Sequence, residues 1–307
     1  MQPFRFAVQS AVMPSMEAWR GLARRCEDLG YSCLYIPDHF DDQFGPLVAL
    51  TVAAEATSTL RVGSLVFDND YRHPVVLAKE IATLDLASDG RVEFGLGAGW
   101  RITDYDESGI PLDPASVRVE RMLEGLTVMR ELWSNEKVTF TGAHYQVDGA
   151  QGLPRPGRVP PIVIGGGSRR ILSIAGREAD IVGVNPDLRS GGFGPEVLAG
   201  ILPERWDERV RWVRDAAGDR MDHIELQVLT FLVDVGTPRR EALERASGMF
   251  GLVPDVLADV PIGIAGTVDE ICEQLRQRRE RWGFSYIVIH TGEVDAFAPV
   301  VARLTGT

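Results

Sequence analysis

Apolar residues along the chain follow two alternating patterns. Short runs rich in β-branched and aromatic residues are followed by longer stretches in which apolar residues recur every three or four positions. The first pattern predicts buried strands, and the second predicts helices that pack one face against a sheet. Because eight such strand–helix units follow one another, the sequence predicts a (β/α)8 barrel, or TIM barrel, formed by residues 1–307 as a single domain.

The expected elements can be placed along the chain from these patterns. Strands are expected at residues 4–9, 32–36, 60–65, 91–95, 162–165, 180–184, 224–231 and 286–290. Helices are expected at residues 15–29, 46–57, 74–86, 114–133, 203–217, 268–282 and 294–304. Ser15 and Thr267 are suited to cap helix starts, and Gly30 and Gly283 are suited to end helices.

Residues 135–161 are rich in glycine and proline and break the alternation, so we expect an insertion that passes over the barrel mouth before the fifth strand.

A doubly wound open sheet is the competing architecture. It would normally carry a glycine fingerprint at the first strand–helix turn, where this chain has Gln9-Ser10-Ala11-Val12. The barrel is therefore preferred.

Composition and charge narrow the classes of partner. The 32 basic and 44 acidic residues give a net charge of -12, which repels nucleic acid and anionic membrane surfaces. The three cysteines show no metal-ligand spacing and are expected to be reduced thiols, without a metal. Neither a signal peptide nor an apolar run of about 20 residues is evident. We expect a cytoplasmic protein with a small-molecule substrate and no nucleic-acid or membrane partner.

Candidate chemistry lies at the ends of four predicted strands, because the functional residues of a barrel gather on the loops that follow its strands. Asp38 and His39 follow the second strand. A histidine is the side chain best suited to move a proton near neutral pH, although an ordinary polar turn would also explain the pair.

The third and fourth strands end in residues suited to a planar ring. Gly63 and Ser64 lead into Leu65 and Val66, which would present an apolar surface. The fourth strand ends in the segment Gly95-Leu96-Gly97-Ala98-Gly99-Trp100. Its glycines let the backbone approach a ligand closely, and Trp100 adds an aromatic wall. The segment lacks the full glycine spacing of a dinucleotide-binding motif. Tight packing inside the barrel is the alternative explanation of these glycines.

The fifth strand is followed by Gly165-Gly166-Gly167-Ser168, which opens a helix containing Arg169 and Arg170. Exposed amides at a helix start, the positive end of the helix dipole and two guanidinium groups together favour a phosphate site. A flexible turn without a ligand is the alternative.

The segments PDHF, GSLVFDNDYRHPVVLAKEIATLDLASDGRVEFGLGAGW and PPIVIGGGS, in this order, resemble the bacterial luciferase-like monooxygenase superfamily. Within it they resemble the branch of oxidoreductases that use the deazaflavin coenzyme F420. The resemblance covers almost the whole chain. It implies a TIM barrel with an insertion, a flavin or deazaflavin ring over the strand ends, and a non-proline cis peptide near Leu65–Val66.

The resemblance also implies roles for individual residues. His39 would protonate or deprotonate the substrate. The cofactor would be bordered by Asp38, His39, Ser64, Leu65, Val66, Gly97, Ala98, Gly99 and Trp100, and its phosphate would be held by Gly165, Gly166, Gly167 and Ser168. A sugar-phosphate dehydrogenase of the superfamily has a catalytic glutamate where this chain has Trp100. That departure argues against the sugar-phosphate activity, and Asp104 is a weak substitute for the glutamate.

Three functions are compatible with the resemblance. The leading hypothesis is hydride transfer between coenzyme F420 and a small organic substrate, with His39 as the proton donor and Trp100 shaping the pocket. The second is an FMN-dependent monooxygenase, and the third is a carrier or sensor that binds the cofactor without catalysis. A homodimer is expected, because related barrels pair through outer helices, here those at residues 46–57 and 74–86.

Overall fold

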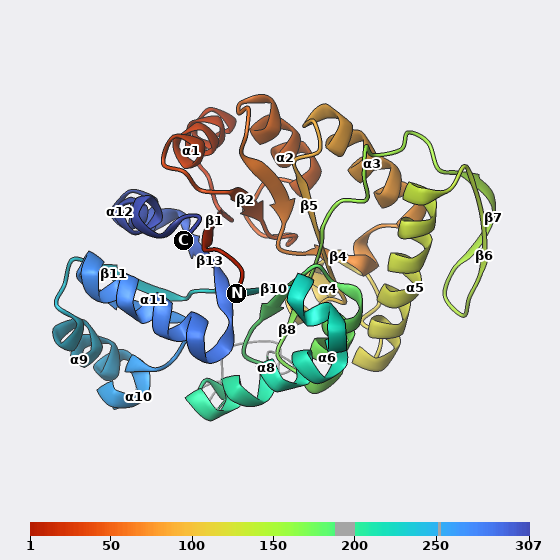
Figure 1. The fold of residues 1–307 in the computed structure, drawn as a ribbon. Coiled ribbons are helices and arrows are strands. Elements are labelled where there is room, and N and C mark those ends of the chain that lie inside the picture. The colour runs from red at the N-terminus through yellow and green to blue at the C-terminus, as the bar shows by residue number, and fades with distance from the viewer. Residues whose placement is uncertain (188–199, 251–252) are drawn as a thin grey trace. The chain divides into compact units, whose positions relative to one another are not determined.

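In the computed structural model, which describes residues 1–187, 200–250 and 253–307, parallel strands alternate with helices (Figure 1). The strands form one sheet in the order β3 (Arg61–Ser64), β2 (Cys33–Ile36), β1 (Arg5–Gln9), β13 (Phe284–His290), β10 (Glu225–Leu229), β9 (Ile181–Val184), β8 (Ile162–Gly166), β5 (Val92–Gly97) and β4 (Phe67–Asp68). Because β3 also pairs with β5, the sheet closes on itself. The fold is therefore a (β/α)8 barrel, and the sequence prediction is confirmed.

The chain divides into two units, of which the first contains residues 1–9, 26–33 and 165–307. In this unit β1 pairs with β13, β13 with β10, and β10 with β9, all in parallel. Its helices are α6 (Arg169–Glu178), α8 (Pro203–Ala217), α9 (Arg239–Phe250), α10 (Pro254–Ala258), α11 (Val268–Trp282) and α12 (Val294–Leu304), with the 3-10 turns η2 (Gly218–His223) and η3 (Thr291–Glu293).

The ends of α11 illustrate why several boundaries could be placed from sequence. Thr267 accepts a hydrogen bond from the backbone N–H of Glu270, and the Glu270 side chain accepts one from the Thr267 N–H, which completes a capping box. Gly283 ends the helix with a φ of 92°.

The seventh barrel strand ends earlier than the sequence predicted. The residues that follow it form β11 (Leu232–Val235), which pairs with β12 (Gly263–Gly266) in a separate small sheet.

The second unit contains residues 10–25 and 34–164. Here β3 and β4 both pair with β5, and β5 pairs with β8. The helices are α2 (Pro46–Glu55), α3 (Pro74–Ala87), α4 (Ile102–Ser108) and α5 (Ala115–Ser134), with the 3-10 turn η1 (Asn69–Tyr71); helix α1 (Met16–Asp28) begins in this unit. Helix α4 was not expected from the sequence.

The insertion of residues 135–161 contains an antiparallel hairpin, made of β6 (Lys137–Thr141) and β7 (Gln146–Gln151). Its turn is bound to α5, because the Glu124 carboxylate accepts the backbone N–H groups of Ala143, His144 and Tyr145 at 2.8–3.1 Å. These three hydrogen bonds hold the Glu124 pKa below its ordinary value against the opposing effect of desolvation. The sequence predicted the interruption but not its strand pairing.

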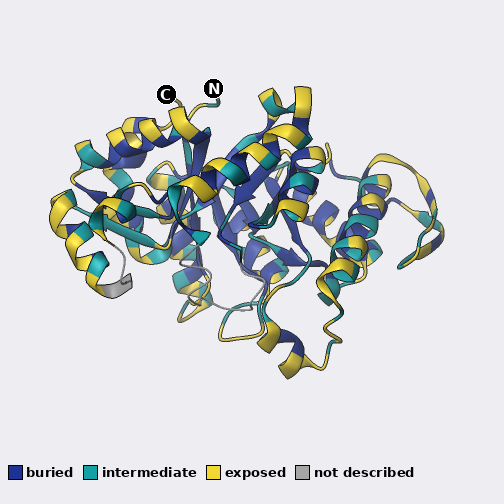
Figure 2. Cartoon of the chain, turned by 90° about the horizontal axis from the view of Figure 1, so that it is seen from below, coloured by how far each residue is buried: buried dark blue, intermediate teal, exposed yellow. Residues whose placement is uncertain are grey.

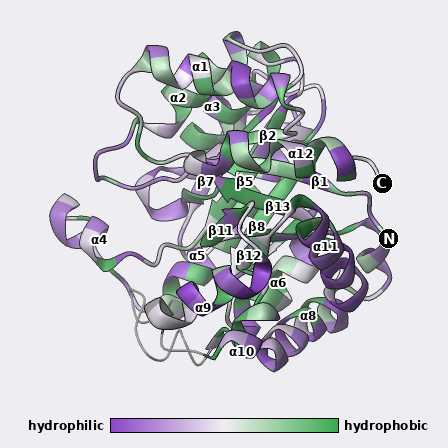
Figure 3. Ribbon diagram, turned by 90° about the vertical axis from the view of Figure 1, so that its left-hand side faces the viewer, coloured by the Kyte–Doolittle hydropathy of each residue, from purple (hydrophilic) through white to green (hydrophobic). Residues whose placement is uncertain are grey.

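Burial follows the hydrophobic pattern closely. The barrel strands are largely buried and apolar, whereas the helices and the hairpin β6–β7 expose polar faces (Figures 2 and 3). Val48 on α2 and Val76 and Leu86 on α3 are exceptions, with exposures of 64%, 52% and 48%. Pairing of two copies through these helices stays a prediction. Within the described residues, no helix is both long enough and apolar enough to cross a bilayer.

Candidate active site

The end of β2 places Asp38 in a buried ion pair. Asp38 is 4% exposed, and the two terminal nitrogens of Arg72 donate to its two carboxylate oxygens at 2.5 and 3.1 Å. The backbone N–H of Asp68 donates to the same carboxylate at 3.1 Å. Asp38 therefore binds the segment after β3 to the end of β2. Its proposed contact with a cofactor stays a prediction.

The ends of β3 and β5 form a small apolar surface. The peptide bond between Leu65 and Val66 is cis, at the position that the family resemblance indicates. Both side chains are partly exposed. Val66 lies over Gly97, where an added Cβ would come within 2.6 Å of the Val66 Cγ2 atom. Ser64 is buried, and its hydroxyl donates to the Ile36 carbonyl at 2.8 Å, so it also ties β3 to β2.

The loop after β5 lies against the end of β2. Arg118 of α5 donates to the carbonyls of Ala98 and Gly99 at 3.0 and 3.2 Å, which fixes the loop backbone. Trp100 is 38% exposed. Its ring meets the His39 ring edge-on, with centroids 5.9 Å apart and planes at 85°. The predicted segments at Asp38, Leu65 and Gly97 therefore meet at one end of the second unit.

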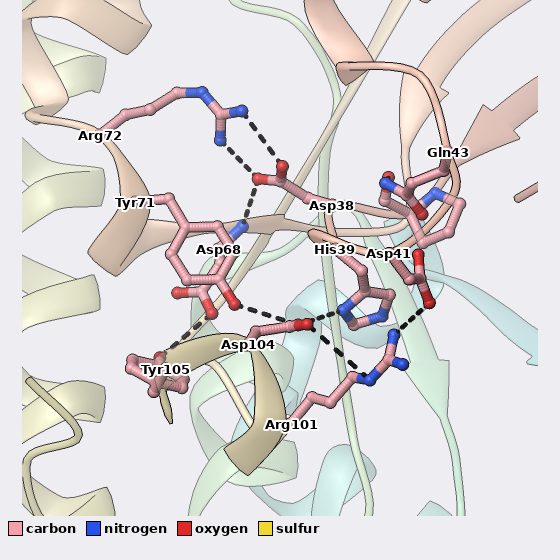
Figure 4. A network of polar contacts seen from close by, with 11 residues as sticks. Asp38, His39, Asp41, Gln43, Asp68, Tyr71, Arg72, Arg101, Asp104 and Tyr105 are labelled. Carbon is pink, nitrogen blue, oxygen red and sulfur yellow. Dashed lines mark hydrogen bonds and ion pairs between the residues drawn. The ribbon is translucent and has the colours of Figure 1, made fainter. Parts of the chain in front are cut away.

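His39 is bound to a buried carboxylate (Figure 4). Its Nδ1 atom lies 2.6 Å from Oδ2 of Asp104, whose side chain is only 3% exposed. The same oxygen accepts the hydroxyl of Tyr71 at 3.2 Å. Among the described residues, no hydrogen bond is formed by Nε2 of His39, so that nitrogen is available to a ligand. Asp104 is thus a hydrogen-bond partner of His39.

A second carboxylate cluster lies beside the first. The Tyr105 hydroxyl is 3.1 Å from Oδ2 of Asp68 and from Oδ2 of Asp70, and Arg121 of α5 donates to Asp70 at 2.8 Å. Burial raises the pKa of Asp68 to about 7, and the nearby charges of Asp70 and Asp38 raise it further, against opposing hydrogen bonds. Sequence reasoning missed this cluster, because nothing in the local sequence distinguishes Asp68 from the aspartates that lie at the surface.

We expect Asp68 to make the stability of the protein pH-dependent. Its pKa in the folded chain is about 7, above the ordinary value of 3.8, so between these values the folded protein holds a proton that the unfolded chain has released. The free energy of unfolding should therefore fall as pH rises through this window, by a few kcal/mol at about 1.4 kcal/mol per pKa unit. Asp68→Asn imitates the protonated acid and should remove this fall.

Thermal unfolding of Asp68→Asn and wild type at a series of pH values tests the expectation. The variant should match wild type near pH 4.5 and melt at a higher temperature near pH 8. Asp106→Asn, at an exposed position of α4, is the matched control and should follow wild type throughout. If the difference in melting temperature between Asp68→Asn and wild type is the same at every pH, this result would contradict a raised pKa of Asp68.

The glycine-rich segment Gly165–Ser168 belongs to the first unit and borders a pocket of about 430 Å³ there. The pocket is lined by Gly167, Ser168, Arg169, Arg170, Asp187, Gly200, Arg205, Glu208, Arg209 and Trp212. Four arginines against two acids give the lining a positive balance. Ser168 is the N-cap of α6, and its side chain forms no capping hydrogen bond.

Arg209 is a buried residue of the pocket lining. It is 4% exposed and donates to the carbonyls of Gly167 and Gly200 at 3.2 and 2.6 Å. Gly167 could not be replaced easily, because an added Cβ would lie 2.4 Å from the backbone of Pro186 and Asp187. The loop therefore presents backbone rather than side chains to the pocket.

Comparisons with known proteins match almost the whole chain. A family model described as luciferase-like monooxygenase matches residues 1–193. An F420-dependent glucose-6-phosphate dehydrogenase from Intrasporangium calvum is 28% identical over 294 residues, which cover 87% of this chain and 86% of that protein.

Two solved structures have folds similar to that of this chain. The structure of an F420-dependent secondary alcohol dehydrogenase, in complex with an F420-acetone adduct, aligns over 99% of each chain with a TM-score of 0.80 and 18% identity. The coenzyme F420 dependent tetrahydromethanopterin reductase from Methanopyrus kandleri aligns over 99% of this chain and 100% of that chain, with a TM-score of 0.77 and 19% identity. At these identities the likeness shows the fold alone.

Proposed function

The chain belongs to the luciferase-like monooxygenase family and is an oxidoreductase, and from this premise we propose that it transfers a hydride between coenzyme F420 and a small organic substrate. The near full-length similarity to an F420-dependent dehydrogenase favours F420 over FMN. The observation that carries the proposal is the arrangement of His39, whose Nδ1 is held by Asp104 while Nε2 is left for a ligand.

The second unit offers surfaces suited to the ring of the cofactor. Leu65 and Val66 are partly exposed, and Gly97 allows Val66 to lie flat against β5. An apolar surface of this kind is suited to the face of a planar ring, and the fixed carbonyls of Ala98 and Gly99 supply acceptors at its border. We infer that Asp38, His39, Ser64 and Trp100 surround the same ring.

The first unit offers groups suited to the phosphate and the acidic tail of the cofactor. A helix start such as that of α6 and guanidinium groups such as those of the pocket are suited to bind phosphate and carboxylate. We infer that Gly165, Gly166, Gly167 and Ser168 hold the phosphate.

The mechanism divides the work between cofactor and protein. When bound, F420 supplies the hydride chemistry and reacts poorly with oxygen. His39 would exchange a proton with the substrate through Nε2, and the Trp100 indole beside it would limit the room and exclude water. Because Trp100 takes the place of an acidic side chain, we propose that the substrate is not a sugar phosphate.

Cofactor titration tests the proposal directly. Apoprotein should bind F420 saturably, with one molecule per chain, when the change in F420 absorbance or fluorescence is followed. Wild type should then turn over at least one member of a panel of small alcohols and ketones, monitored at the F420 absorbance band, with propan-2-ol and glucose 6-phosphate included. Tight binding of FMN without binding of F420 would instead support the FMN-dependent monooxygenase.

A further inference from the structure

We propose that Asp104 is the positioning residue of His39: it fixes the imidazole as the tautomer with hydrogen on Nδ1, so that Nε2 points its lone pair at the substrate. The inference rests on the proposed function for its catalytic consequence. The tautomer itself is a property of the protein without cofactor and can be measured there.

The geometry requires a defined proton arrangement. His39 Nδ1 lies 2.6 Å from Asp104 Oδ2, a distance typical of a charge-assisted hydrogen bond. An ionised carboxylate can only accept, so Nδ1 must donate. In the neutral imidazole the other nitrogen is then an acceptor, and the ring becomes a base at Nε2.

The surroundings of Asp104 place a hydroxyl donor and a positive charge beside its carboxylate. The Tyr71 hydroxyl donates to Oδ2, and Nε of Arg101 lies 3.8 Å from Oδ1. Burial and the charges of Asp68 and Asp104 raise the pKa of Tyr71 well above its ordinary value, so Tyr71 stays a donor. Arg101 is itself held by Asp41, whose Oδ2 accepts from the Arg101 Nη1 at 2.5 Å. Besides His39, Asp104 therefore has the Tyr71 hydroxyl as a donor to Oδ2 and the positive charge of Arg101 near Oδ1.

The same surroundings predict what an amide would do at this position. In Asp104→Asn the side-chain oxygen and nitrogen can exchange positions, and the positive charge of Arg101, 3.8 Å from Oδ1, favours the amide oxygen on its own side. The amide NH2 then faces His39 and donates to Nδ1. The imidazole should change to the tautomer with hydrogen on Nε2. In this tautomer Nε2 can no longer act as a base toward the substrate.

Histidine nitrogen NMR on the apoprotein tests the tautomer. Protein labelled with ¹⁵N-histidine is measured at a pH where imidazoles are neutral, and the His39 signals are assigned by their loss in His39→Gln. Wild-type His39 should show hydrogen on Nδ1. His73 is an internal reference of the opposite kind, because its Nδ1 accepts the Val75 N–H at 3.3 Å.

Two variants and one control complete the test. Asp104→Asn should show His39 with hydrogen on Nε2, and Asp104→Glu, which keeps an acceptor, should retain the wild-type signature. Asp41→Asn removes a carboxylate one step further along the network and should leave the His39 signals unchanged. Wild-type His39 signals in Asp104→Asn, or hydrogen on Nε2 in wild type, would overturn the inference.

Kinetics separate this inference from the proposed function. With the substrate that wild type turns over, Asp104→Asn should lower kcat by about 10²- to 10⁴-fold, with F420 affinity unchanged and with partial recovery in Asp104→Glu. Full kcat in a folded Asp104→Asn enzyme that shows the altered tautomer would refute the positioning role. If wild type has no F420-dependent turnover, the proposed function fails, whereas the NMR result still decides the tautomer.

Discussion

His39→Ala should lower kcat by about 10²- to 10⁴-fold and leave the affinity for F420 within about threefold of wild type, the range expected when a proton-transfer group is removed. The reason lies in the structure: His39 is partly exposed, is held by Asp104 through Nδ1, and has no other hydrogen bond among the described residues. Its removal therefore takes away the proposed proton carrier, while Ser64 and the Asp38–Arg72 pair still join the strand ends.

The measurement pairs steady-state turnover with an F420 titration of each variant. His223→Ala, at an exposed histidine of η2 in the other unit, is the matched control and should retain wild-type rates. A His39→Ala protein that binds F420 and keeps its full function would instead support the non-catalytic carrier or sensor. Loss of F420 binding together with turnover would show that His39 holds the cofactor rather than moves a proton.

Asp38→Ala should have the largest effect on stability, a loss of about 3–5 kcal/mol in the free energy of unfolding. The substitution leaves the Arg72 guanidinium, whose side chain is 22% exposed, without its carboxylate partner. It also removes the acceptor of the Asp68 N–H. A buried charge without a partner cannot recover its hydration, so the cost exceeds what the ion pair itself contributes.

Urea denaturation of single and double variants measures this effect. In Asp38→Ala/Arg72→Met the uncompensated charge is gone, and part of the lost stability should return, giving a coupling energy of about 1–3 kcal/mol between the two positions. Asp41→Ala, at a partly exposed carboxylate of the same loop, should cost less than about 1 kcal/mol. A loss below 1 kcal/mol for Asp38→Ala would show that the pair is not the structural link inferred here.

The sequence by itself determined the eight barrel strands and most of the helices around them. These elements depend on local properties: hydrophobic periodicity, the capping residues Thr267 and Gly283, and proline at the first turn of α2 and α3. The same local signals marked the glycine-rich ends of β5 and β8, because the backbone conformation that glycine permits is a property of the residue itself. The family resemblance then added the cis peptide at Leu65–Val66, which the structure confirms.

Only the tertiary structure decided how the polar side chains are paired. His39 and Asp104 are 65 positions apart, and Asp38 and Arg72 are 34 apart, so neither partner could be identified from its own sequence neighbourhood. The pKa of Asp68 depends on its burial and on contacts with Asp70 and with Tyr105 of α4, which the strand pattern does not reveal. Local sequence fixes which backbone segments form, but hydrogen bonds, burial and charge at the site arise from groups that meet only when the barrel closes.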